Sequence, residues 1–115
     1  MALHENSQVM NNIEHIQEEA VKRIVREVHP LRIVLFGSAL SGKIETNSDL
    51  DLLVIMPDGA KRLETAYSIH RCLRGLGCAR DVVVVLESEV EALCDNQYLV
   101  IHTALSTGKE LYHAA

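Results

Sequence analysis

Three short apolar runs, each stopped by turn-forming or charged residues, limit the folds that this chain can adopt. They lie in residues 31–36, 50–56 and 80–86. Apolar runs of this length that are rich in β-branched residues are typical of strands buried on both faces. Gly37 follows the first run and Pro57 the second, and neither residue continues a strand readily. The sequence therefore predicts a small sheet built from buried strands.

The segments between these runs carry a helical period. Apolar residues recur every three or four positions over residues 13–28, with charged residues between them, which predicts an amphipathic helix. We expect it to end at His29, because the residue before a proline is disfavoured in the helical conformation. We expect a further helix over residues 60–76 and one or two helices over residues 90–105. A short extended tail is expected over residues 110–112.

The order of these elements predicts the fold class. We expect a single α/β domain over residues 1–115, with a small mixed sheet of three to four strands and helices mainly on one face. A helical crossover separates the strands at 50–56 and 80–86, which makes them parallel. The strands at 31–36 and 50–56 have a shorter connection and can be antiparallel.

Composition and charge argue against several classes of function. The net charge is −5 with histidines neutral, so the surface would repel long nucleic acid. No apolar run approaches the roughly 20 residues of a membrane span, and the polar N-terminus lacks the apolar stretch of a signal peptide. We therefore expect a cytosolic protein. The 3 cysteines, an odd number, are expected to be reduced.

Aspartates stand at the starts of two predicted strands. Asp49 and Asp51 open the strand at 50–56, and strand alternation points both carboxylates to the same face. Such a pair alone is more often turn chemistry at a strand end. Asp81 begins the neighbouring parallel strand, however, so three carboxylates would converge. Carboxylate oxygens are ligands that suit Mg²⁺ or Mn²⁺. The alternative for Asp81 is a strand-end cap paired with a basic residue such as Arg80.

Gly37 and Ser38 follow the first predicted strand. A glycine lets the backbone approach a ligand closely, and N–H groups at the start of a helix attract phosphate. The Ser38 hydroxyl adds a donor. An isolated Gly-Ser pair is usually a turn or a helix cap, so this pair gains meaning only from its position.

The spacing of these motifs resembles the signature of the polymerase β nucleotidyltransferase superfamily. Gly37-Ser38 is followed, after ten residues, by Asp49-Leu50-Asp51. The flanking residues are similar in particular to the minimal nucleotidyltransferase (MNT) branch. The resemblance implies that Gly37 and Ser38 bind the triphosphate and that Asp49 and Asp51 bind metal. It also implies that Asp81 is the third metal-binding carboxylate and helps to deprotonate the acceptor hydroxyl.

The same resemblance implies a reaction and a partner. MNT proteins transfer a nucleoside monophosphate, here AMP from ATP with Mg²⁺, onto a hydroxyl. They are commonly paired with a small helical HEPN protein, an RNase toxin, for which they act as antitoxin. A tyrosine of that toxin is the expected acceptor. In one departure, Ser41 stands where relatives often carry arginine, which removes one phosphate or partner contact.

Two other functions remain open at this point. The chain could be a catalytically silent module that neutralises its partner by covering it, which Ser41 allows but the three aspartates argue against. It could also modify a small molecule such as an aminoglycoside, although nothing in the sequence supplies the extra acidic pocket for a polycation. The sequence leaves the nucleotide, the acceptor and the oligomeric state open.

Overall fold

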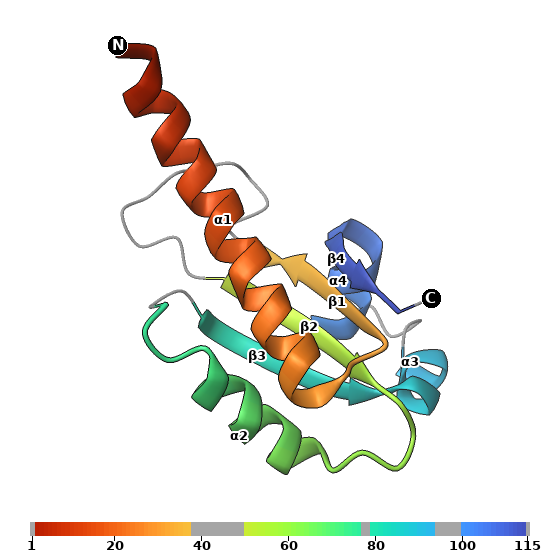
Figure 1. Cartoon of the computed structure of the whole chain (residues 1–115). Helices are drawn as coiled ribbons and strands as arrows, with labels where there is room; N and C mark the ends of the chain where they lie inside the picture. Colours follow the sequence, from red (N-terminus) through yellow and green to blue (C-terminus); the bar gives the residue numbers. More distant parts are fainter. Residues whose placement is uncertain (1, 38–49, 77–78, 94–99, 115) are drawn as a thin grey trace.

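The computed structural model describes residues 2–37, 50–76, 79–93 and 100–114 (Figure 1). Side chains within the first helix are described from His15 onward. The elements in these ranges are α1 (Ala2–Val28), β1 (Arg32–Phe36), β2 (Leu50–Met56), α2 (Arg62–Cys72), β3 (Ala79–Leu86), α3 (Glu87–Leu93), α4 (Val100–Thr107) and β4 (Lys109–His113).

The four strands form one mixed sheet in the order β3-β2-β1-β4. β1 is antiparallel to both β2 and β4, whereas β2 is parallel to β3. The parallel pair is joined by the α2 crossover, as the sequence predicts. The fold class is thus confirmed, and the tail expected at 110–112 supplies the fourth strand.

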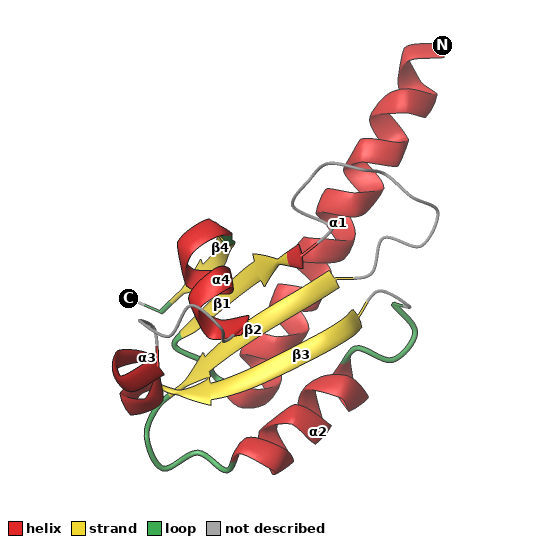
Figure 2. Cartoon of the chain, turned by 180° about the vertical axis from the view of Figure 1, so that it is seen from behind, coloured by secondary structure: helices red, strands yellow, loops and turns green. Residues whose placement is uncertain are grey.

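Helices pack on both faces of the sheet. The long helices α1 and α2 cover one face, where Ile24, Leu52 and Ile69 belong to one buried cluster. The short helices α3 and α4 pack against the other face, where Leu53 and Ile101 belong to a second cluster. The prediction that helices lie mainly on one face therefore describes the long helices, while α3 and α4 contribute a smaller second layer (Figure 2).

Local chemistry explains where the elements end. α1 ends at Val28 because His29 adopts a left-handed conformation, with φ of 51°, and its N–H donates to the Val25 carbonyl at 3.1 Å. A left-handed residue after the last helical turn is a common way to end a helix. Gly108 allows α4 to end against β1, because an added Cβ would overlap the Ala104 carbonyl oxygen and the Val34 side chain.

Two helices differ in length from the sequence expectation. α1 begins at Ala2 instead of residue 13, since no glycine or proline interrupts residues 2–28. α2 covers only Arg62–Cys72 of the expected 60–76, because residues 73–76 form turns around Gly75, which has φ of 90°. None of the described helices is long and apolar enough to cross a membrane.

Hydrogen bonds from Arg23 connect α1 to the end of α2. Its Nη1 donates to the carbonyl oxygens of Cys72 at 3.2 Å and Arg74 at 3.1 Å, and its Nε donates to Glu19 at 3.2 Å. Carbonyls at the end of a helix lack partners within the helix, and a cation there also opposes the helix dipole. Arg23 thus stabilises the turn that leads from α2 towards β3.

Replacing Arg23 should measurably weaken the fold. We expect Arg23→Met to lower the free energy of unfolding by about 1–2 kcal/mol, because charged hydrogen bonds to backbone carbonyls are lost from a partly exposed site. Arg26→Met, on an exposed position of the same helix, should change it by less than about 0.5 kcal/mol. Urea unfolding measures both values, and equal midpoints for the two variants would contradict this role.

Candidate active site

Asp51 and Asp81 lie side by side on neighbouring strands. Asp51 in β2 is the register partner of Asp81 in β3, and the two strands are parallel. Paired residues of adjacent strands point to the same face and are separated by about 4.8 Å along the hydrogen-bonding direction. Leu53 and Val83, two positions further along, belong to the cluster under α3 and α4. Both aspartates therefore belong to that face of the sheet.

A β-bulge creates this arrangement. Leu50 pairs with Ala79, but the next register pair is Asp51 with Asp81, so β3 contains one extra residue at this point. Without the extra residue, Asp81 would pair with Leu52 and would point to the face covered by α1 and α2. The sequence predicts that the starts of β2 and β3 lie together. It does not predict the bulge that brings the carboxylates of Asp51 and Asp81 to one face.

The two carboxylates differ in exposure. Asp51 is only 7% exposed and lies between Asp81 and Phe36, its partner on β1. Asp81, in contrast, is exposed to solvent. Burial of a carboxylate is unfavourable unless hydrogen bonds or a cation compensate for it. One buried and one accessible carboxylate on the same face fit a cation that arrives from solvent.

Gly37 packs directly against Asp51. Its φ is 82°, and a Cβ added there would overlap Asp51 Oδ2 and would lie 3.0 Å from Asp51 Cγ. Only glycine combines that backbone conformation with so close an approach. The residue predicted to bind phosphate thus touches the carboxylate predicted to bind metal.

The remaining predicted site residues lie outside the described ranges. Asp49 and Ser38, as well as the atypical Ser41, fall within residues 38–49, outside the described part of the chain. The described residues contain no group of three or more His, Cys, Asp or Glu side chains that could hold a metal ion. The pair of Asp51 and Asp81 nevertheless suits Mg²⁺, which typically takes one or two carboxylates and completes its octahedron with water and phosphate oxygens.

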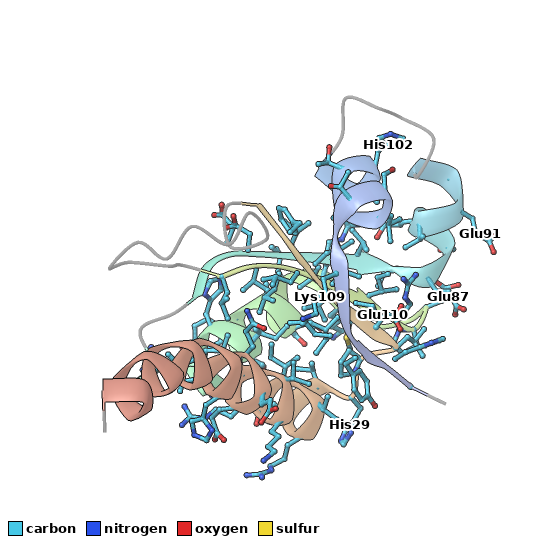
Figure 3. All side chains as sticks on the ribbon, turned by 90° about the horizontal axis from the view of Figure 1, so that it is seen from above. His29, Glu87, Glu91, His102, Lys109 and Glu110 are labelled. Carbon is cyan, nitrogen blue, oxygen red and sulfur yellow. The ribbon has the colours of Figure 1, made fainter. Side chains whose placement is uncertain are left out.

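Two cavities lined by described residues lie away from these carboxylates. One of about 440 Å³ separates α1 from β4 and is lined by Gln17, Glu18, Val21, Lys22 and residues 109–111. Another, of about 370 Å³, lies beside α3 and includes Glu87 and Glu91 among its lining residues. Figure 3 shows Lys109 and Glu110 on β4, and Glu87 and Glu91 on α3. Neither cavity is lined by Asp51 or Asp81, so we base the candidate site on the carboxylates and Gly37.

Cys72 is a free cysteine, whereas Cys78 and Cys94 lie outside the described part of the chain. The Cys72 thiol donates to the Ile69 carbonyl at 3.2 Å. Burial raises the pKa of the Cys72 thiol, and the nearby Glu27 carboxylate raises it further. The neutral thiol is therefore favoured, which makes Cys72 a poor nucleophile.

Known proteins share this sequence pattern and fold. A family model described as a nucleotidyltransferase domain matches residues 17–107, which include Gly37, Asp51 and Asp81. A crystal structure from Sulfolobus solfataricus, of a protein provisionally described as a nucleotidyltransferase, resembles this fold with a TM-score of 0.52. The sequences are 21% identical, and the match covers 73% of this chain and 78% of the other. At that identity the likeness concerns the fold alone. No curated protein sequence matches significantly.

Proposed function

We propose a specific reaction for this chain, which belongs to the nucleotidyltransferase domain family. The chain transfers AMP from Mg²⁺-bound ATP, in the cytosol, to a tyrosine hydroxyl of a HEPN-type toxin and thereby silences the toxin. The observation that supports this proposal most strongly is the pairing of buried Asp51 with exposed Asp81, next to Gly37.

The donor side of the reaction uses the residues around Gly37. Asp51 and Asp81, with Asp49 from outside the described ranges, would hold Mg²⁺ or Mn²⁺, and the backbone at Gly37 and Ser38 would hold the triphosphate. The metal supplies positive charge that balances the phosphates and the leaving pyrophosphate. Because Asp51 is buried, its carboxylate has little freedom to move, which would help to hold the donor in position.

The acceptor side depends on Asp81. The acceptor oxygen attacks the α-phosphorus of ATP, the bond to the pyrophosphate oxygen breaks, and the hydroxyl proton passes to the Asp81 carboxylate. Asp81 is exposed, so a docked protein can bring a hydroxyl to it. We therefore assign the acceptor hydroxyl to a protein partner.

Intact-mass spectrometry tests this reaction. The candidate partner is a HEPN-type protein whose reading frame neighbours that of this chain. After its incubation with the chain, ATP and Mg²⁺, we expect a mass increase of one or more AMP groups. Asp81→Asn should reduce the transfer rate at least about 100-fold, because the proton acceptor is lost. The same variant should bind the partner with an affinity within about twofold of the wild type, since a single exposed carboxylate contributes little to docking.

The matched control is Glu64→Gln, which removes an exposed carboxylate on α2. It should leave both transfer and partner binding unchanged. A partner that binds but never gains AMP, and whose toxicity is still neutralised by Asp51→Asn, would instead identify a silent binding module.

A further inference from the structure

No described strand pairs with the outer edge of β3, although the helix α2 packs against this strand. β3 is the last strand at one side of the sheet, and Figure 2 shows it with β2 on its inner side. An edge strand presents backbone N–H and C=O groups that can pair with another extended chain.

The two edges of the sheet differ in their protection. β4, at the other edge, spans 5 residues and begins with the exposed charged residues Lys109 and Glu110. β3 spans 8 residues, and although Arg80 and Asp81 near its start are charged, the four consecutive valines that follow and Leu86 carry no charge and no proline. Charged side chains and prolines are the usual means by which edges are kept from pairing. The β3 edge therefore retains the ability to bind a strand.

A hydrogen bond identifies the backbone groups that face this edge. The Leu86 N–H donates to Glu89 Oε1 at 2.9 Å, so it points away from β2. Alternate residues of a strand direct their backbone groups to the same side. Val82 and Val84 therefore present their N–H and C=O groups at the outer edge. The Glu89 side chain occupies the backbone N–H of Leu86 but does not bond those of Val82 and Val84.

The open edge begins at the candidate active site. Val82 directly follows Asp81, the exposed partner of buried Asp51. A strand added to β3 would place one of its side chains about 4.5–5.5 Å from that of Asp81, measured between Cβ atoms. That side chain would point to the face on which Asp51 lies. The edge can thus deliver an acceptor side chain to the carboxylates.

We propose that the outer edge of β3 binds the acceptor protein through an extended segment that carries the modified tyrosine. The segment adds to the sheet as a further strand, a known mode of peptide recognition. Exposed acidic residues, Asp81 and Glu87, flank the valines, so the segment is apolar in its centre and basic near Glu87. This inference rests on the proposed transfer to a protein hydroxyl.

A second copy of this chain fits the edge less well as a substrate. Pairing of β3 with β3 would place the sequence Ala79–Leu86 opposite Asp81, and that segment contains no serine, threonine or tyrosine. It would therefore cover the aspartates without supplying a hydroxyl. A strand from a different protein provides both the pairing and the acceptor.

Hydrogen exchange with and without the HEPN-type partner tests the edge directly. We expect the Val82 and Val84 amides to exchange at least tenfold more slowly in the complex than in the free chain. The Val83 amide, which faces β2, should be protected in both states. Transfer that proceeds while Val82 and Val84 stay unprotected would overturn the inference and leave the proposed function intact.

Two substitutions at Val84 isolate the backbone group. Val84→Pro removes the outward N–H without removing a bond to β2, and it should reduce transfer to the partner at least tenfold while Mg²⁺-ATP affinity stays within twofold. Val84→Ala keeps the N–H but also loses side-chain packing, so it measures the cost of that packing loss, and its reduction of the transfer rate should be much smaller than that of Val84→Pro. Equal losses in both variants would overturn the inference.

The remaining outcomes separate the two proposals. Protection of Val82 and Val84 that grows with chain concentration, in the absence of a partner, would assign the edge to a second copy and overturn the inference. Protection by a partner that never gains AMP would support docking at the edge and contradict the proposed transfer.

Discussion

We expect Gly37→Ala to lower the rate of nucleotidyl transfer about 100-fold. The added Cβ overlaps the Asp51 carboxylate, so either the carboxylate or the loop must move by an ångström or more. Displacements of that size in a catalytic arrangement can cost about 100-fold in rate. Single-turnover kinetics at saturating Mg²⁺-ATP measures the effect.

Gly59→Ala is the matched control for Gly37→Ala. Gly59 also has a positive φ, 98°, but nothing lies within 4 Å of a Cβ built there. Both variants therefore share a backbone strain of about 1–2 kcal/mol, whereas only Gly37→Ala disturbs Asp51. Gly59→Ala should retain activity within about twofold when assayed well below its unfolding temperature. Equal activity in the two variants would show that contact with Asp51 is irrelevant to transfer.

Asp51→Asn should have the larger effect, about 1000-fold or more on the transfer rate. Asparagine has nearly the same volume as aspartate but lacks the charge that the proposed metal requires. Mg²⁺-ATP affinity should fall together with the rate, while the circular dichroism spectrum stays unchanged. The isosteric control is the exposed Asp58→Asn, which lies in the turn after β2. If Asp51→Asn kept wild-type activity, the charge of the buried Asp51 carboxylate would not be required for transfer.

Much of the fold could be predicted because local signals determine it. The strand Leu50–Met56 has the predicted bounds, since an apolar run interrupted only by Asp51 ends at a proline. β1 and β3 agree to within one residue of each predicted end. The end of α1 beside His29 could be predicted from Pro30, although the left-handed conformation of His29 could not. In each case the residues that decide the structure are neighbours in the sequence.

The features that could not be predicted depend on contacts between distant residues. The bulge in β3 is a matter of register between Asp51 and Asp81, which are 30 positions apart. The overlap that requires glycine at position 37 arises only after β1 and β2 have paired. Packing of α4 against β1 likewise depends on the close approach at Gly108. Sequence motifs identified Gly37, Asp51 and Asp81, but the pairing of the strands determines which of them meet.

We propose that Asp51 and Asp81, beside Gly37, form the metal-nucleotide site. Paramagnetic broadening by Mn²⁺ tests it most directly, because the broadening falls steeply with distance from the ion. In amide spectra with ATP and substoichiometric Mn²⁺, we predict loss of the Gly37, Asp51 and Asp81 signals, and Asp51→Asn should restore the other two. Broadening centred on Glu87 and Glu91, or on the cavity beside Lys22, with Asp51 and Asp81 unaffected, would contradict the account.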